Sequence, residues 1–256
     1  MALTEKQKFD IEAVIAHCLT TKFKNYVPQN NFMPFHFRLL GRDRMALYSF
    51  MQSLLTTFGT SIFEPVAKEL AKTKFAKVET QYTVGNEIYK DCQQAVQDII
   101  NELTITGNPD KKKELQTLKK HLGGETNKLK AIKVDLFVEM QSGEQYFFDL
   151  KTAKPNKGDF QKFKQTLLEW AGIAYTKNKN AKVHTLIAIP YNPYEPEPYQ
   201  FWTMKGMLDT DEEMMVSENF WNFLGGDGVY TELLDCFEKV GLALRPEIDA
   251  YFERYK

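Results

Sequence analysis

Apolar residues recur at helical spacing through the first part of the chain, where polar residues separate them in groups of two or three. This spacing places the apolar side chains on one face of a helix. Helices are therefore predicted over residues 4–23, 41–59, 60–75 and 86–103. Thr4 is the expected N-cap of the first helix, and Gly59 is the expected C-cap of the second. The intervening stretch 24–37 contains two prolines and is expected to be a loop.

The pattern changes near residue 133, where apolar and polar residues begin to alternate. Residues 133–140 and 146–153 are β-prone and flank the turn sequence "QSGEQ", which predicts a β-hairpin. A helix is predicted over 159–175 with Asp159 as its N-cap, and the apolar run 182–190 is typical of a buried strand. The final stretch, from residue 215 to 242, is again helical in pattern. Strand, turn, strand, helix and strand in this order predict an α/β core.

Composition bounds the class of protein. The 256 residues are 43% hydrophobic, which suits one large domain with a substantial core, and no linker long enough to divide the chain is evident. The three cysteines form no metal-binding pattern and suit a reducing compartment. The N-terminus lacks the apolar core of a signal peptide, and no stretch reaches the length of a membrane span, so a cytoplasmic protein is expected.

Charge identifies no partner by itself, because the formal net charge is only −1. A nucleic-acid site would need a local basic patch. Eight lysines lie between Lys111 and Lys133. Two interpretations remain open for this stretch, a solvated helical connector or a surface that follows DNA phosphates.

The second strand of the predicted hairpin carries opposite charges on one face. Asp149 and Lys151 are two residues apart, and pairing the strands across a turn near Ser142 brings Asp135 alongside them. Burying such charges without partners costs several kcal/mol each, and two carboxylates repel unless a cation lies between them. Mg²⁺ prefers oxygen ligands, and a lysine ammonium can hydrogen-bond an attacking water or phosphate oxygens. The grouping indicates metal-assisted hydrolysis of a phosphodiester.

These residues resemble a nuclease signature. Asp135, followed by Asp149, Leu150 and Lys151, is similar to the PD-(D/E)xK motif, with Val134 in place of the usual proline. The order of a helix with a glutamate, a hairpin, a helix and a buried strand makes the resemblance more specific than the triplet alone.

Flanking stretches extend the resemblance over the whole chain. The first core helix of many type II restriction endonucleases resembles "FGTSIFEPVAKELA", and their second catalytic strand with its helix resembles "DLKTAKPNKGDFQKFKQTLLEWAG". The chain as a whole looks like the Tde-type group of these enzymes. The resemblance implies an α/β (α+β) fold with a small mixed central sheet flanked by helices, a helix-rich N-terminal part and a helical C-terminus. One domain over 1–256 is expected, with its catalytic core at about 57–190 and an extension over 191–256.

The resemblance also implies roles for individual residues. The metal ligands it implies are Asp135, Asp149, the carbonyl of Leu150, and Glu64. Lys151 would orient or activate the attacking water, and Glu64 would be the helix carboxylate, with Glu87 as its rival. Simpler interpretations stay open: Glu64 complements a helix N-terminus, worth about 0.3–1 kcal/mol. Asp149 and Lys151 form an exposed strand-end ion pair, worth about 0–1 kcal/mol.

Candidate DNA contacts lie near the hairpin and in an arginine-rich stretch further upstream. A loop before a helix N-terminus suits phosphate or base-edge contact, and arginine fits the O6/N7 edge of guanine. The residues expected to contact DNA are Arg42, Arg44, Lys154, Asn156, Lys157 and Gln161. Alternatively, the two arginines pair with Asp43 and Glu69, and the asparagine serves the turn of its own loop.

The resemblance implies Mg²⁺ as the cofactor and double-stranded DNA as the substrate. It also implies that the enzyme acts as a homodimer, which cuts the DNA at a short palindrome of the GGNCC type in restriction–modification defence. Two other hypotheses stay open. One is a nuclease of repair or recombination without a fixed site. The other is a non-catalytic DNA-binding module.

Overall fold

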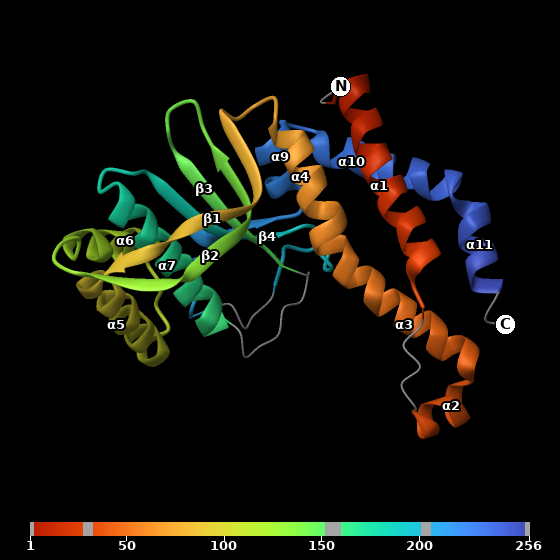
Figure 1. The fold of residues 1–256 in the computed structure, drawn as a ribbon, viewed down its shortest axis with the longest axis horizontal. Helices are drawn as coiled ribbons and strands as arrows, with labels where there is room; N and C mark the ends of the chain where they lie inside the picture. The colour runs from red at the N-terminus through yellow and green to blue at the C-terminus, as the bar shows by residue number, and fades with distance from the viewer. Residues whose placement is uncertain (1–2, 28–32, 152–159, 201–205, 254–256) are drawn as a thin grey trace. The chain divides into compact units, whose positions relative to one another are not determined.

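The computed structural model describes residues 3–27, 33–151, 160–200 and 206–253 (Figure 1). The chain divides into two compact units. Residues 1–69 with 226–256 form the helical unit, and residues 70–225 form the sheet unit. The expectation of one domain over 1–256 stays a prediction.

A five-stranded mixed sheet is the centre of the sheet unit. Its strands, in spatial as well as sequence order, are β1 (Lys77–Tyr89), β2 (Thr126–Glu139), β3 (Gln145–Leu150), β4 (Val183–Ile189) and β5 (Met214–Val216). The first three strands pair antiparallel, and β3, β4 and β5 pair in parallel. The predicted hairpin is confirmed as β2 and β3. Gly143, at φ +83°, supplies the left-handed residue that the turn between them needs.

Helices cover the sheet and close the core. The helices of the sheet unit are α5 (Lys90–Thr106), α6 (Lys111–Lys120), α7 (Phe160–Lys177), α8 (Thr210–Glu213) and α9 (Glu218–Gly225). Helix α7 packs across β1 and β4 and against α5, so that side chains such as Leu167, Trp170 and Ile187 share one buried cluster. Gly172 permits this close approach, because a Cβ there would lie 2.7 Å from Cδ1 of Ile88.

The helical unit is built around aromatic side chains. Its elements are α1 (Glu5–Asn25), α2 (Pro34–Leu40), α3 (Arg42–Thr57), the π-helix η1 (Phe58–Phe63), most of α4 (Glu64–Ala71), α10 (Val229–Ala243) and α11 (Arg245–Glu253). Phe50 is buried and lies within 5.5 Å, centroid to centroid, of the rings of Phe23, Tyr251 and Phe252. Thr4 caps α1 as predicted, in a reciprocal capping box with Gln7.

The largest difference between the sequence prediction and the structure is strand β1, which was not predicted. The helix predicted over 86–103 begins only at Lys90, because the preceding residues complete a 13-residue strand. The alternation of Val78, Thr80 and Tyr82 is the β signal at the start of this strand. This correction matters for the site, because β1 pairs directly with the strand that carries Asp135.

Two smaller predictions in the helical unit are also wrong. The expected loop over 24–37 contains the start of α2, where Pro34 occupies the first turn, a position that needs no N–H donor. Gly59 does not end a helix, because the backbone continues through the π-helix η1 into α4. Pro65 is the second residue of α4. The predicted fold class, a mixed α/β structure with a small mixed sheet and flanking helices, is confirmed.

Candidate active site

The hairpin brings its three charged residues together. Leu136 of β2 lies opposite Phe148 of β3, so the adjacent residues Asp135 and Asp149 meet at the same end of the strand pair. The Leu150 backbone N–H donates a hydrogen bond to Oδ2 of Asp135 at 2.8 Å. The Lys151 Nζ is 2.8 Å from Oδ1 of Asp149.

The Asp149 carboxyl is largely shielded from water and is influenced by the neighbouring Asp135 carboxyl. The Asp149 side chain is only 13% exposed, and this burial raises the pKa of its carboxyl to about 6. The Lys151 ammonium opposes the rise in pKa, while the neighbouring Asp135 carboxyl adds to it. A bound divalent cation would relieve the cost of charging Asp149 beside a second carboxylate.

The donor set suits a hard cation. Carboxylate and backbone carbonyl oxygens are the ligands that Mg²⁺ and Ca²⁺ take in proteins, and Asp135, Asp149 and the Leu150 carbonyl are all of this kind. Within the described ranges, no group of three or more His, Cys, Asp or Glu side chains gathers closely enough to hold a metal ion. The hairpin alone therefore offers two carboxylates, and any cation there would keep other ligands such as water or phosphate.

Lys151 has a second contact that the sequence did not reveal. Its Nζ lies 4.8 Å from the centroid of the Phe163 ring on α7, and its backbone N–H donates to the Ala188 carbonyl of β4 at 2.9 Å. The ammonium is thus held between the Asp149 carboxylate and an aromatic face, with 29% of its side chain exposed. In the sequence, Phe163 is one of several apolar residues at helical spacing, so nothing distinguishes it from core.

Gln81 is a further neighbour that sequence reasoning missed. Its Nε2 lies 3.4 Å from Oδ1 of Asp135. The contact comes from β1, a strand that was not predicted.

The helix carboxylate stays a prediction. Glu64 begins α4 in the helical unit and is 4% exposed, and its ligand role rests on the resemblance. The rival Glu87 is exposed and pairs with Lys128 on β2. Lys128 precedes Asp135 by seven residues, which corresponds to about 20 Å along a strand. This separation places Glu87 away from the carboxylate pair.

The predicted DNA contacts fall in different parts of the chain. Lys154, Asn156 and Lys157 lie outside the described residues, and Gln161 is exposed in the first turn of α7. Arg42 and Arg44 are exposed at the start of α3 in the helical unit. Arg44 donates to the Leu40 carbonyl at 3.0 Å and lies 3.6 Å from Asp43, which was the alternative foreseen for it. All six remain predictions as DNA contacts.

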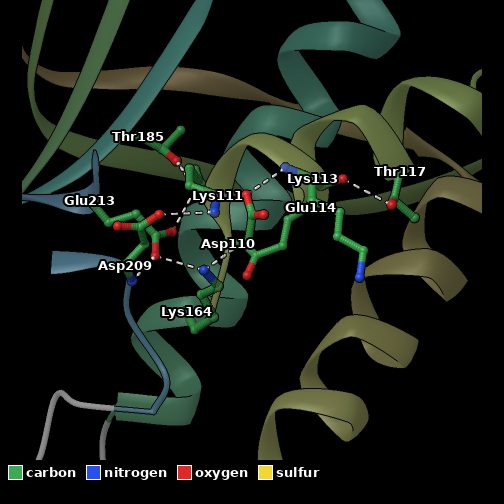
Figure 2. Close-up of polar contacts among 9 residues, drawn as sticks. All are labelled: Asp110, Lys111, Lys113, Glu114, Thr117, Lys164, Thr185, Asp209 and Glu213. Atoms are coloured by element: carbon green, nitrogen blue, oxygen red, sulfur yellow. Dashed lines mark hydrogen bonds and ion pairs between the residues drawn. The ribbon is translucent and has the colours of Figure 1, made fainter. Parts of the chain in front are cut away.

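The lysine-rich stretch is not uniformly solvated. Lys112 and Lys113 are exposed, but Lys111 is 3% exposed and its Nζ lies 2.7 Å from Oε1 of Glu213. The same Glu213 carboxylate lies 2.6 Å from Nζ of the buried Lys164 on α7. This part of the structure therefore contains a buried charge network that both interpretations of the stretch overlooked (Figure 2).

Polar groups from four elements complete this network. Lys111 Nζ donates to Oγ1 of Thr185 on β4 at 2.8 Å, and the Asp209 backbone N–H donates to Glu213 at 2.9 Å. Lys164 Nζ also lies 2.5 Å from Oε2 of Glu114, without the angles of a hydrogen bond. Burial raises the pKa of the Glu213 carboxyl, but the two ammoniums outweigh burial and hold that pKa below its ordinary value. The network joins α6, α7, α8 and β4 around the Glu213 carboxylate.

Comparison with known proteins identifies the family. Residues 3–241 match the family described as type II restriction endonuclease, HinfI. The chain belongs to this family. Because the match covers nearly all of the chain, it includes the hairpin, the buried charge network, all of the sheet unit and most of the helical unit.

Individual type II restriction enzymes are similar to the chain over most of its length. The chain is 28% identical to the type II restriction enzyme HgiCII of Herpetosiphon aurantiacus over 84% of this chain and 80% of the relative. It is 29% identical to HgiBI of the same organism over 84% of this chain and 79% of the relative. It is 24% identical to MjaII of Methanocaldococcus jannaschii over 82% of this chain and 58% of that enzyme.

Membership of the HinfI family confirms the enzyme class expected from the hairpin. The chain is a type II restriction endonuclease, a hydrolase that cuts DNA. Enzymes of this class generally use divalent metal ions. Over the described residues, every helix is too short or too polar to cross a membrane.

Proposed function

We propose that the chain is a Mg²⁺-dependent, site-specific deoxyribonuclease whose reaction centre is the end of the β2–β3 hairpin. The observation that carries this proposal is the convergence of the Asp135 and Asp149 carboxylates with the Lys151 ammonium, in a chain of the HinfI family. An exposed surface ion pair is the simpler alternative. It fits poorly, because a surface pair has no reason to bury Asp149 beside a second carboxylate.

The residues divide the chemistry between them. Asp135 and Asp149, with the Leu150 carbonyl, hold Mg²⁺. When bound, the ion supplies a Lewis acid that polarises a phosphate oxygen and acidifies a water. Lys151 carries three N–H donors, one of them directed at Asp149, so the others are available to orient the attacking water or a phosphate oxygen. Hydrolysis adds water across one P–O bond and leaves one phosphate and one hydroxyl end.

DNA recognition extends the proposal to residues that are not part of the hairpin. Phosphate contacts position a protein on DNA, and base-edge contacts select the sequence. Gln161 is exposed on the helix that follows the hairpin, and Arg42 and Arg44 present exposed guanidinium groups that can read guanine. Between the hairpin and α7 in the sequence, the residues assigned to phosphate and base contacts are Lys154, Asn156 and Lys157. The proposed substrate is a palindrome of the GGNCC type, as the Tde-type resemblance implies.

A palindromic site suggests a homodimer that acts inside the cell. A twofold dimer presents one reaction centre to each strand of a palindrome. Restriction of foreign DNA takes place where that DNA enters, which makes the cytoplasm the proposed location.

Digestion of a plasmid of known sequence tests the function. We expect discrete fragments in Mg²⁺, and sequencing of the fragment ends should return one palindrome and one cut position. A smear would instead favour the second candidate, a nuclease without a fixed site. Absence of cleavage on several DNAs of different sequence would contradict both.

Lys151→Ala tests the reaction centre. Because Lys151 acts on the reacting groups and not on the fold, we expect loss of cleavage by at least about a hundredfold with DNA binding retained. Fragment analysis and a gel-shift assay measure the two properties. Lys182→Ala is the matched control, since Lys182 is exposed beside β4 and pairs with Glu144 at 3.3 Å, and it should cut like the unmodified chain. Full activity of Lys151→Ala would remove Lys151 from the mechanism.

A further inference from the structure

Gln81 has an unusual backbone conformation for its position. It lies within the strand β1 but has φ +52°, a region that non-glycine residues seldom occupy. In the described part of the chain, Ser217 is the other non-glycine residue with positive φ. Asparagine and aspartate are the side chains that tolerate this region best, and glutamine is not among them. The backbone at Gln81 is therefore strained within a regular element.

The strained residue lies opposite the first catalytic carboxylate. Thr80 pairs with Leu136 and Tyr82 pairs with Val134, which places Gln81 across from Asp135. The Gln81 amide Nε2 is 3.4 Å from Oδ1 of Asp135, at the long end of the hydrogen-bond range. Hydrogen bonds of reaction centres are often long before substrate binds.

Asp135 is consequently held from both sides. Its Oδ2 accepts the Leu150 N–H of β3 at 2.8 Å, and its Oδ1 faces the Gln81 amide of β1. The amide is neutral, so it orients the carboxylate without adding a third negative charge beside Asp149. A donor on each oxygen fixes the plane of the carboxylate and hence the direction of its remaining lone pairs.

The positive φ explains how β1 can provide this contact and an adjacent aromatic stack on the same face. The Tyr82 ring stacks on Phe137, with centroids 4.2 Å apart. Asp135 and Phe137 are two residues apart in β2, a spacing that puts them on one face of a regular strand. Consecutive residues of a regular β1 would point to opposite faces. Because Gln81 leaves the extended conformation, both it and Tyr82 reach partners on one face.

We propose that Gln81 is a positioning residue, which orients the Asp135 carboxylate for the divalent cation, and that its strained conformation lets Tyr82 reach the same face of the sheet. The inference rests on the proposed function of the hairpin. Backbone strain of this kind persists where the surrounding structure enforces it, and it gathers at functional sites. Gln81 lies where an extended residue would satisfy the sheet but would not hold both Asp135 and the Tyr82–Phe137 stack.

Two substitutions separate strain from positioning. Gln81→Gly removes the amide and relieves the backbone, so the melting temperature in metal-free buffer should rise by about 2–4 °C. Gln81→Leu removes the amide, keeps the bulk of the side chain and keeps the strain, so its melting temperature should not rise. Both variants should need about ten- to a hundredfold more Mg²⁺ for half-maximal cleavage, because loss of a group that orients a metal ligand weakens metal binding to this extent.

A readout without catalysis accompanies the cleavage assay. Ca²⁺ should raise the melting temperature of the unmodified chain, and this rise should shrink for both Gln81 variants at the same Ca²⁺ concentration. Gln94→Leu is the matched control: the Gln94 amide donates to Asp98 at 2.9 Å on the exposed face of α5, so its loss removes the same kind of contact elsewhere. The control should keep both the Mg²⁺ requirement and the Ca²⁺ response.

The outcomes distinguish this inference from the proposed function. Gln81 variants with an unchanged Mg²⁺ requirement and an unchanged Ca²⁺ response would overturn the positioning role while leaving the nuclease intact. If the unmodified chain cuts no DNA, the proposed function fails, and the Ca²⁺ response of the variants still decides whether Gln81 supports a cation site. A lower melting temperature for Gln81→Gly would overturn the argument from strain.

Discussion

The Lys151 ammonium lies between a carboxylate and an aromatic ring. Asp149 neutralises it on one side, and Phe163 presents its π face on the other, 4.8 Å from Nζ. A cation over an aromatic face gains about 0.5–2 kcal/mol, with the larger values for desolvated pairs. Phe163 thereby limits the positions that the lysine can take without competing for its N–H donors.

Substitution of Phe163 should affect turnover more than DNA affinity. Phe163→Leu removes the π face and keeps an apolar side chain, so kcat should fall about two- to tenfold with little change in KM for DNA. Steady-state kinetics on a short duplex with one site measure both constants. Phe163→Tyr retains the ring face and should restore most of kcat. Equal losses for both variants, with matching losses of melting temperature, would mean that Phe163 only packs.

The individual residues of the site differ in how visible they are in the sequence. Asp135, Asp149 and Lys151 are charges within β-prone strands, a pattern that burial alone does not explain. Gln81 and Phe163 have no such signal. A glutamine in an unrecognised strand looks like surface, and a phenylalanine at helical spacing looks like core, so only the three-dimensional contacts show their relation to the site.

At the scale of elements, the buried network links the lysine-rich helix α6 to α7, which follows the hairpin (Figure 2). Two ammoniums and the Glu213 carboxylate lie where water does not reach, and each depends on the others to offset the cost of desolvation. Phe163 and Lys164 are neighbours on α7. One contacts Lys151 and the other enters the network, so the same turn of helix serves both.

Loss of the central carboxylate should destabilise the whole sheet unit. Glu213→Gln leaves the ammoniums of Lys111 and Lys164 buried without a full countercharge, so the free energy of unfolding should fall by about 3–5 kcal/mol. Urea denaturation measures this change. Glu212→Gln is the matched control, because Glu212 is exposed and solvent screens its pair with Lys112, so this variant should unfold nearly like the unmodified chain. Similar values for the two variants would contradict a structural role for the network.

The sequence predicted those helices and strands whose hydrophobic periodicity or capping residues were clear. The hairpin, α1, α7 and β4 have clear periodicity or caps, and their positions agree with the sequence patterns. Strand β1 was missed because its register shifts at Gly85, between Thr83 and Glu87, and a helical pattern begins in the sequence at the same place. The buried network could not be predicted, since its members are far apart in sequence and single lysines ordinarily stay solvated.

For the whole molecule, the proposed mechanism makes activity depend on an added divalent cation. Excess EDTA should abolish cleavage, and Mg²⁺ in excess of the chelator should restore it. Ca²⁺ should support DNA binding without turnover, because it accepts looser geometry and activates water poorly. Plasmid digestion and gel shift with each ion measure the two steps. Cleavage in excess EDTA would contradict a metal-dependent centre, and Lys151→Ala in Ca²⁺ should still bind.

Because the molecule is nearly neutral, DNA binding must depend mainly on local cationic side chains. A net charge of −1 provides no general attraction to phosphate, so affinity must come from a few cationic side chains and should fall as salt rises. The fold class and the enzyme class follow from the sequence because the pattern of the core and the hairpin charges are both local. The arrangement of the sheet unit around β1 is not local, and it needed the structure.

Burial of Lys111 affects how mutagenesis of the basic stretch must be interpreted. An alanine scan for DNA-contacting lysines would include Lys111 with its exposed neighbours Lys112 and Lys113, and would find it inactive. Its failure would come from misfolding, since the missing ammonium leaves Glu213 with one lysine partner fewer inside the protein. A thermal-stability measurement on every variant is therefore needed before any lysine of this helix is assigned to the phosphate backbone.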